Sequence, residues 1–300
     1  KKKIMNVLSL FDGMSCGQIA LDRIGVKYDN YFASEIDKHS IKVTQSNYSK
    51  TIQIGDIRNI KAVDLPKIDL LIGGSPCQGF SFAGKQLNFE DERSKLFFEF
   101  IRLLKELNPT YFLLENVRMK EEYQNVISSL LNVKPIVINS ALMSAQNRVR
   151  YYWTNIKGVT QPTDKKIKLS DILQSDNFKT SNKATILGRR INSRGVREDY
   201  NKSIPLVQCL EVRASNREKS NCLTTVAKDT VLTPLPIGRH IDVYGKKLPY
   251  RNYTAIERLR LQNIDDDYCN GLSLNQVVKM TGNSFTVDVI AHILSFINGT

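Results

Sequence analysis

Short apolar runs alternate with amphipathic segments along the first half of the chain. Four short runs rich in apolar, β-branched or aromatic side chains predict strands: residues 4–10, 28–34, 51–54 and 68–72. Residues 18–24 instead carry apolar side chains at helical spacing and are followed by a glycine, which is typical of a helix and its stop signal. This alternation predicts an α/β fold built on a mostly parallel sheet.

Glycine-bearing or acidic segments stand directly after three of these predicted strands. The turn 11–17 follows the first, Glu35 ends the second and Asp56 follows the third. Because ligands bind at the carboxyl edge of open α/β sheets, these segments predict a nucleotide-like ligand. Glu35 is then placed for ribose hydroxyls, and Asp56 for an adenine amine between the neighbouring isoleucines. Each acid alone would as readily be a solvated loop carboxylate, and only the succession of three sites favours the ligand.

A cysteine follows the predicted strand 68–72 after a sharp turn. Two glycines allow the turn, and Pro76 fixes the backbone just before Cys77. The next segment, 80–93, has no sustained period and predicts a long loop. A thiol at a strand end beneath a loop is placed for nucleophilic chemistry, whereas most free cysteines are small buried hydrophobic residues. The turn alone leaves both interpretations open.

A carboxylate and two guanidinium groups accompany the later strands. Glu115 follows a predicted strand at 110–114, at the same sheet edge as Cys77, where a buried carboxyl suits a general acid. Alternation places Arg148 and Arg150 on one face of a strand that continues into an aromatic run. Paired guanidinium groups suit phosphate or base-oxygen contacts, and an exposed strand face paired with acids is an equal alternative.

Charge and cysteine usage narrow the class of protein. The 300 residues include 43 Lys+Arg and 30 Asp+Glu, a formal net charge of +13, which favours a polyanionic partner although lysine also serves solubility. Five scattered cysteines and three scattered histidines predict neither a disulfide framework nor a metal site, and they fit a reducing cytosol. No apolar run approaches the roughly 18 residues of a membrane span and no signal peptide is visible, so a cytoplasmic protein without membrane contact is expected.

The alternation of strands and helices fades after residue 157. Residues 179–219 carry ten Lys or Arg against four acids, and the part 188–197 combines glycine with several guanidinium groups. Such a segment suits phosphate contacts and guanine recognition in the major groove, with a solvated basic loop as the alternative.

Amphipathic patterns return towards the C-terminus. They predict helices at residues 253–262, 275–280 and 287–297, in addition to one at 94–107. We therefore expect one domain from residues 1–157 and 251–300 and a second domain from residues 158–250.

The motifs resemble, in sequence and in order, those of a known family. Seven segments follow the order found in C5-cytosine DNA methyltransferases: Phe11-Asp-Gly-Met-Ser-Cys-Gly, Glu35, Gly55-Asp-Ile, Gly74-Ser-Pro-Cys-Gln, Glu115-Asn-Val, Gln146-Asn-Arg-Val-Arg and Gly282-Asn-Ser-Phe. Residues 80–93 also look like the mobile catalytic loop of that family. The resemblance covers residues 4–157 and about 217–300. The first motif is similar to the animal de novo branch, whereas the short chain resembles bacterial and phage enzymes.

The resemblance implies a Rossmann-like methyltransferase fold, a mixed and mostly parallel sheet with helices on both faces. It also implies a small, irregular, β-rich target-recognition domain. The cofactor would be S-adenosyl-L-methionine, released as S-adenosyl-L-homocysteine. The residues implied to bind it are Phe11, Asp12, Gly13, Met14, Ser15, Cys16, Gly17, Glu35, Ile36, Asp56, Ile57, Leu96, Asn283 and Ser284.

The resemblance further implies a reaction on a cytosine flipped out of double-stranded DNA. Cys77 would add to C6 of the base, and Glu115 would bond N3 and the exocyclic amine to favour that addition. Loss of the C5 proton would follow methyl transfer, and water is the expected base. The implied catalytic residues are Pro76, Cys77, Gln78, Glu115, Asn116, Arg148 and Arg150. The implied DNA contacts are Ser81, Arg189, Arg190, Arg194, Arg197, Arg213 and Arg217.

Two other functions stay open on the same residues. A tRNA cytosine methyltransferase of the same fold is one, but that branch carries a Cys-Phe-Thr motif that this sequence lacks. A catalytically inactive DNA-binding paralogue is the other, and such proteins lose the nucleophile, the acid or the cofactor residues, which are all present here. We expect no metal, a cytoplasmic protein associated with the nucleoid, and a separately acting cognate restriction endonuclease as a candidate partner.

Overall fold

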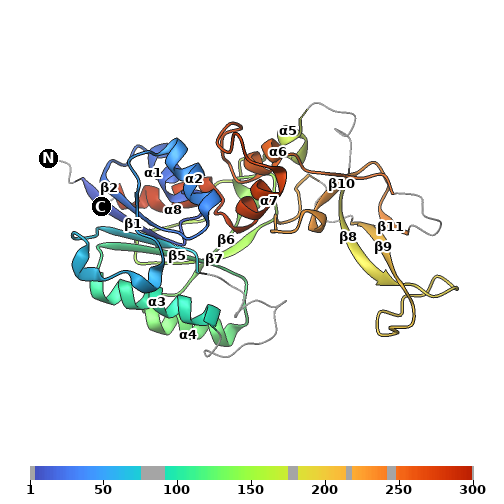
Figure 1. Ribbon diagram of the computed structural model, residues 1–300, viewed down its shortest axis with the longest axis horizontal. Coiled ribbons are helices and arrows are strands. Elements are labelled where there is room, and N and C mark those ends of the chain that lie inside the picture. The colour runs from blue at the N-terminus through green and yellow to red at the C-terminus, as the bar shows by residue number, and fades with distance from the viewer. Residues whose placement is uncertain (1–3, 76–91, 175–181, 214–217, 242–247, 299–300) are drawn as a thin grey trace.

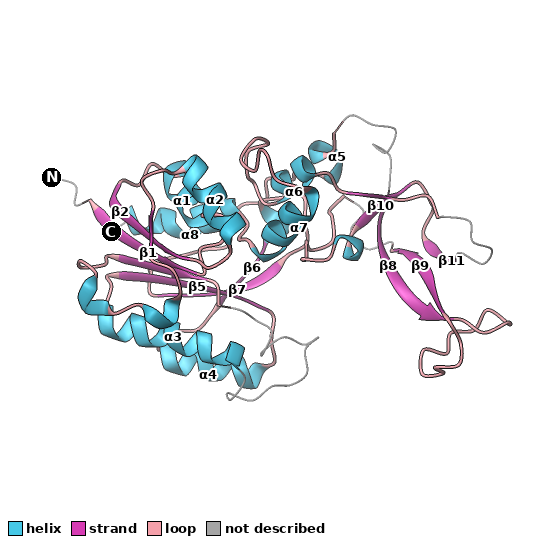
Figure 2. Cartoon of the chain, in the orientation of Figure 1, coloured by secondary structure: helices cyan, strands magenta, loops and turns pink. Residues whose placement is uncertain are grey.

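The computed structural model describes residues 4–75, 92–174, 182–213, 218–241 and 248–298. Its two sheets lie towards opposite ends of the long axis of the molecule (Figures 1 and 2). Helices cover the first sheet, and a smaller group of helices lies between the two. Both ends of the chain lie near the first sheet.

The first sheet contains, within the described residues, β1 (Met5–Leu10), β2 (Tyr28–Ser34), β3 (Ile52–Gln53), β4 (Leu70–Gly73), β5 (Tyr111–Val117), β6 (Ile136–Asn139) and β7 (Val149–Thr154). Their order across the sheet is β3-β2-β1-β4-β5-β7-β6. The strands from β3 to β5 in this order are parallel, and β7 is antiparallel to both of its neighbours. The predicted mixed, mostly parallel sheet is therefore confirmed.

Helices cover both faces of this sheet, as predicted. One face carries α1 (Cys16–Arg23), α2 (Lys38–Asn47) and α8 (Val287–Ser295), and the other carries α3 (Glu92–Leu107) and α4 (Glu121–Leu131) (Figure 1). Strand β1 carries apolar residues on both of its faces. Val7 packs in the core beneath α1 and α8, whereas Leu8 and Leu10 pack in the core on the α3 side. Successive side chains point to opposite faces, so a strand that helices cover on both faces needs apolar residues on each of them.

The second sheet is antiparallel and separate from the first. It contains β8 (Asn182–Arg190), β9 (Leu206–Val212), β10 (Val231–Thr233), β11 (Gly238–Ile241) and β12 (Arg251–Asn252), in the order β11-β9-β8-β10-β12. All of the pairings are antiparallel. A small core that includes Ile186, Leu210 and Val231 supports one face. The expected β-rich second part is therefore present.

Three helices lie between the sheets: α5 (Leu169–Ile172), α6 (Ala255–Leu261) and α7 (Leu274–Asn283) (Figure 1). Helix α6 begins with a capping box between Thr254 and Glu257, and α7 begins with one between Ser273 and Gln276. These caps fix the start of each helix. Among the described residues, no helix combines the length and apolar character needed to cross a membrane.

The segment before the second sheet packs back onto the first. The Lys165 backbone N–H donates to the Leu142 carbonyl at 2.8 Å, and its ammonium lies 2.7 Å from Asp288. The Thr160 carbonyl is 2.8 Å from the His292 ring. Residues 160–165 therefore contact the part of the chain that carries the first sheet, and the expected domain boundary at residue 158 stays a prediction.

Strand β5 is longer than the predicted run 110–114. Its pairing with β7 continues through Glu115 and Asn116, which lie opposite Tyr152 and Tyr151. The neighbouring strand thus draws both polar residues into the sheet. Helix α4, which the sequence analysis did not identify, follows directly and carries acids in its first turn, where the helix dipole favours them.

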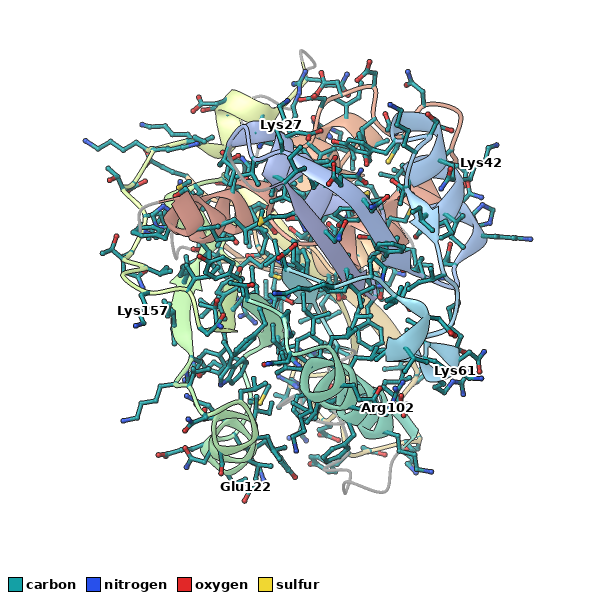
Figure 3. All side chains as sticks on the ribbon, turned by 90° about the vertical axis from the view of Figure 1, so that its left-hand side faces the viewer. Lys27, Lys42, Lys61, Arg102, Glu122 and Lys157 are labelled. Carbon is teal, nitrogen blue, oxygen red and sulfur yellow. The ribbon has the colours of Figure 1, made fainter. Side chains whose placement is uncertain are left out.

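The loop after β3 is fixed to α3. The guanidinium of Arg102 donates to the carbonyl oxygens of Ile57 at 3.4 Å and Ile60 at 3.0 Å. Figure 3 labels Arg102 and, on the neighbouring loop, Lys61. Because this loop begins at Asp56, Arg102 helps to fix the position of one candidate cofactor residue.

Candidate active site

The turn between β1 and α1 is built on left-handed backbone conformations. Phe11 and Gly13 have φ angles of 56° and 60°. This path directs the Gly13 N–H to Glu35, whose Oε2 accepts it at 2.7 Å. The Oε1 atom accepts from the backbone N–H groups of Ile36 and Asp37, each at 2.8 Å. Glu35 therefore joins the first turn to the end of β2.

Asp12 is buried beneath this turn. Its Oδ1 accepts a hydrogen bond from the Tyr31 hydroxyl at 2.9 Å, while its Oδ2 makes no hydrogen bond of normal geometry with any described residue. Burial raises the pKa of Asp12 to about 6, although the nearby Ser9, Tyr31 and Ser15 hydroxyls oppose the rise. The turn therefore contains a carboxyl group that titrates near neutral pH.

We expect Asp12→Asn to increase the free energy of unfolding more at pH 8 than at pH 4.5. The folded-state pKa lies above the ordinary value of 3.8, so the stabilisation by the protonated form is lost as the pH rises through about 6. This rise corresponds to at most about 3 kcal/mol. Urea unfolding of both proteins at the two pH values measures the effect, and a difference that is independent of pH contradicts it.

The C-terminal segment returns to the same turn. The thiol of Cys16 lies beside the Phe285 backbone and the Ser284 side chain, both of which oppose the rise of its pKa. The Tyr268 hydroxyl donates to the Met14 carbonyl at 2.7 Å. Burial raises the pKa of the Cys16 thiol to about 12, so this cysteine is not a nucleophile near neutral pH.

Asp56 follows β3 and caps a short 3-10 turn. Its Oδ1 accepts from the backbone N–H and the Nε of Arg58, both at 3.0 Å, and this partner lowers the pKa of Asp56. Ile57 is buried in the core on the α3 side, whereas Ile36 is 72% exposed. The two isoleucines thus occupy different environments, and their assignment to the faces of an adenine ring stays a prediction.

Three further residues implied to bind the cofactor lie on helices: Gly17 on α1, Leu96 on α3 and Asn283 at the end of α7. A Cβ atom on Gly17 would lie 2.8 Å from the Tyr31 hydroxyl, so this glycine allows α1 to approach β2. Leu96 packs, partly buried, against the core on the α3 side.

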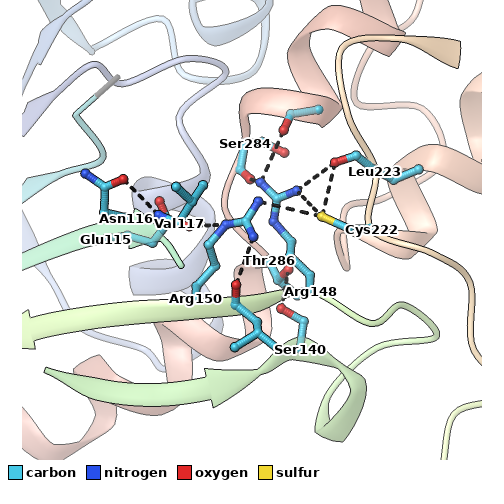
Figure 4. Close-up of polar contacts among 12 residues, drawn as sticks. Glu115, Asn116, Val117, Ser140, Arg148, Arg150, Cys222, Leu223, Ser284 and Thr286 are labelled. Atoms are coloured by element: carbon cyan, nitrogen blue, oxygen red, sulfur yellow. Dashed lines mark hydrogen bonds and ion pairs between the residues drawn. The ribbon is translucent and has the colours of Figure 1, made fainter. Parts of the chain in front are cut away.

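Glu115 and Arg150 form an ion pair between β5 and β7 (Figure 4). Arg150 Nε lies 3.0 Å from Glu115 Oε1, and the two side chains are only 13% and 11% exposed. The contact lacks hydrogen-bond geometry, and Oε1 has no hydrogen-bond partner among the described residues. Glu115 therefore keeps a buried acceptor that its ion-pair partner does not satisfy.

The segment that leads towards Cys77 lies beside this carboxylate. A Cβ atom on Gly74 would lie 3.4 Å from Glu115 Oε2 and 2.8 Å from the Phe285 ring. Asn116 donates from Nδ2 to the Ser75 hydroxyl at 3.1 Å. The ends of β4 and β5 and the C-terminal segment therefore meet at one place.

The two terminal nitrogens of Arg148 donate to distant backbone groups. Its side chain is almost wholly buried and donates to the carbonyls of Leu223 at 2.9 Å and Ser284 at 2.8 Å. A third carbonyl, that of Gly282, lies at 3.2 Å. Arg148 thus joins the start of β7 to two segments far away in the sequence, whereas Arg150 faces Glu115.

The segment before β10 packs tightly on α6 and α7. A Cβ atom on Gly282 would lie 2.3 Å from the Thr224 carbonyl carbon. Arg258, on α6, is 1% exposed and donates to the Thr224 carbonyl at 2.8 Å and to Thr281 Oγ1 at 2.9 Å. These contacts hold the segment before β10 against α6 and α7.

Gly282→Ala should lower the free energy of unfolding by about 2 kcal/mol or more, because the added methyl group meets backbone that cannot turn aside. Gly188→Ala is the matched control, since its Cβ would make an ordinary 3.5 Å contact with the Leu206 side chain. Urea unfolding of both variants compares them. Equal stability would contradict the close approach at Thr224.

The arginines implied to contact DNA lie on the second sheet: Arg189 and Arg190 on β8, Arg194 and Arg197 between β8 and β9, and Arg213 after β9. Several of them pair with acids. Arg189 Nη1 lies 3.6 Å from Asp199, which also pairs with Arg197, and Arg213 Nη2 lies 3.1 Å from Glu211. DNA phosphates would have to compete with these carboxylates.

Comparison with known proteins decides the family. The model of the C-5 cytosine-specific DNA methylase family matches residues 5–298. The chain belongs to this family.

This member of the family is similar to the orphan methyltransferase M.Rho11sI of Bacillus phage rho11s, with 36% identity over 65% of the chain and 44% of the relative. It is also similar to the type II methyltransferase M1.ScrFI of Lactococcus lactis subsp. cremoris, with 31% identity over 95% of the chain and 75% of the relative. The chain spans less than half the length of two Bacillus phage relatives. The solved Entamoeba histolytica methyltransferase EhMeth shares the fold, with a TM-score of 0.71 over 99% of this chain and 98% of that one at 17% identity.

Part of the predicted site lies outside the described residues: Pro76, Cys77, Gln78, Ser81 and Arg217. Their roles stay predictions. Sequence reasoning assigned no role in the site to two residues of this region, Cys222 and Arg258. A charged residue within the apolar pattern of the predicted helix 253–262 marks Arg258, whereas Cys222 lies in the segment 220–225, which the family resemblance covers without giving the cysteine a role.

Proposed function

We propose that the chain transfers a methyl group from S-adenosylmethionine to C5 of a cytosine flipped out of a specific DNA sequence, through a covalent bond between Cys77 and C6. The observation that carries this proposal is the buried Glu115 carboxylate, whose Oε1 lies beside Arg150 without a hydrogen-bond donor among the described residues. Leaving a buried acceptor unsatisfied costs free energy, and the exocyclic amine of a flipped cytosine would supply the donor.

Each step is assigned to residues of the chain. The Cys77 thiolate adds to C6 while the Glu115 carboxyl donates a proton to N3, which makes C5 nucleophilic. After C5 has gained the methyl group, water removes the C5 proton. The Cys77–C6 bond then breaks, the thiolate leaves, and the N3 proton returns to Glu115. Arg150 orients Glu115, and Asn116 holds Ser75 just before the turn to Cys77.

The turn 11–17 fits S-adenosylmethionine, which supplies the methyl group on a positively charged sulfonium. A buried carboxyl oxygen without a normal hydrogen bond, Asp12 Oδ2, and the fixed carboxylate of Glu35 give this region the negative character that a cationic ligand needs. Glu35 and Asp56 would hold the nucleoside. Asn283 and Ser284 would complete the pocket, since Ser284 lies beside Cys16.

Double-stranded DNA is the proposed substrate. The net charge of +13 and the arginines of β8 and the β8–β9 connection would serve phosphate contacts and guanine recognition. Two bacterial relatives are named type II methyltransferases, which supports a role in restriction and modification beside a separate cognate endonuclease. The protein would then act on the nucleoid in the cytoplasm.

Bisulfite sequencing tests the proposal and reveals the target together. DNA from cells that express the chain should contain protected cytosines within one short sequence, and cells that express Cys77→Ser should contain none. Equal conversion of all cytosines in both samples, with the protein folded and abundant, would exclude the proposed reaction.

A further inference from the structure

The thiol of Cys222 lies between two guanidinium groups. Arg148 Nη1 lies 3.4 Å from Sγ, and Arg150 Nη2 lies 3.7 Å from it (Figure 4). The arginines come from the start of β7, whereas Cys222 belongs to the segment that leads into β10 of the second sheet. The sulfur therefore lies between β7, which carries Arg150, and the segment that leads into the second sheet.

The two arginines depend on this sulfur to different degrees. Arg148 has three carbonyl partners of its own. Arg150 contacts Glu115 and, at 2.9 Å, the carbonyl of its neighbour Val149. Among the described residues, Cys222 is the one hydrogen-bond partner that reaches Arg150 from outside β5 and β7. The Cys222 thiol is thus placed to restrain the Arg150 guanidinium, whose other side-chain partner is Glu115.

The surroundings favour the ionised thiol. Burial alone would oppose ionisation, but the guanidinium groups of Arg148 and Arg150 outweigh it and lower the pKa of Cys222 below its ordinary value. By contrast, burial raises the pKa of the other described cysteines, Cys16, Cys209 and Cys269. Cys222 is therefore chemically distinct from the structural thiols of the chain.

We propose that Cys222 is a positioning residue whose sulfur holds Arg150 against Glu115. It would link the segment that enters the second sheet to the catalytic carboxylate. The inference rests on the proposed function, because only there does Glu115 act on a base. Loss of the sulfur should free Arg150 to leave the carboxylate without disturbing the sheet.

Steady-state methylation by Cys222→Ala tests this role. We expect kcat to fall about 10-fold, as for the loss of one charge-assisted hydrogen bond, while KM for S-adenosylmethionine and the unfolding midpoint stay near wild type. The rise of kcat with pH that the ionisation of Cys222 causes should be absent in Cys222→Ala and Cys222→Ser. Cys222→Asp, which restores an anion, should recover part of kcat.

Cys209→Ala is the matched control, since it removes a buried thiol from β9 and should keep the wild-type pH profile. An unchanged kcat and pH profile for Cys222→Ala would overturn the proposal. If a smaller folded fraction of Cys222→Ala accounts for the whole fall in kcat, the proposal would also be overturned.

Alkylation of Cys222 tests its contact with Arg150 without a measurement of methylation. In Cys77→Ser protein, peptide mass spectrometry follows the labelling of Cys222 by iodoacetamide. The dependence of the labelling rate on pH gives the pH at which half of the thiol is ionised. We expect a midpoint below that of an ordinary thiol, and a higher one after Arg150→Met. An ordinary midpoint that Arg150→Met does not move overturns the inference. The expected labelling, together with a wild-type chain that methylates no DNA, would overturn the proposed function instead.

Discussion

Replacing Cys77 by serine should reduce methyl transfer by at least about 10³-fold and leave DNA affinity within about threefold of wild type. The proposed addition to C6 needs an anionic nucleophile, and a serine hydroxyl is not ionised near neutral pH. The binding groups for DNA lie elsewhere, so affinity should not depend on the thiol. Transfer of tritiated methyl groups and a mobility-shift assay measure the two quantities on one protein preparation.

A mechanism-based trap sharpens this prediction. DNA that carries 5-fluorocytosine at the target should remain bonded to the wild-type chain under denaturing conditions, because the C5 fluorine cannot leave as a proton. The adduct should map to Cys77 and be absent in Cys77→Ser. Cys209→Ser, in the second sheet, should still form it. Normal transfer by Cys77→Ser, or an adduct at another residue, would refute the assigned nucleophile.

Glu115→Gln should lower kcat by about 10²-fold or more, because it removes the proton donor for N3 and the negative partner of Arg150. Glutamine has nearly the same shape, so the sheet pairing opposite Tyr152 should survive and the unfolding midpoint should change little. Single-turnover methylation at saturating cofactor isolates the chemical step from product release.

Glu122→Gln provides the comparison for the loss of one negative charge, since this side chain is exposed on α4. Its kcat should equal that of wild type. An unchanged rate for Glu115→Gln would remove Glu115 from acid catalysis, whereas slow turnover by both variants would point to net charge instead.

The first sheet could be predicted from the sequence because its strands are local runs with a physical reason to be apolar. Leu70, Leu71 and Ile72 are all fully buried, since helices cover both faces, and a buried parallel strand admits few polar residues. The turns at the carboxyl ends of β1, β2 and β3 followed from the same argument. Glu35 accordingly lies against the first turn, where adjacent strand ends must meet.

Contacts between distant segments could not be predicted in this way. Alternation predicts Arg148 and Arg150 on one face, but it does not reveal that Arg148 is held by carbonyls 75 and 136 residues away. Those partners depend on how α7 and the segment before β10 pack. Cys222 escaped notice for the same reason, because only the folded chain brings two guanidinium groups to its sulfur.

The return of the C-terminal segment also sets an order of events during synthesis. Cys16 lies beside Phe285, and Arg23 pairs with Asp288, a residue 265 positions later. At ordinary elongation rates the first turn waits on the order of tens of seconds for these partners to leave the ribosome. A transcript with an early stop codon after the second sheet would thus yield a chain that has its proposed nucleophile and acid, yet lacks the helix that packs against its first turn.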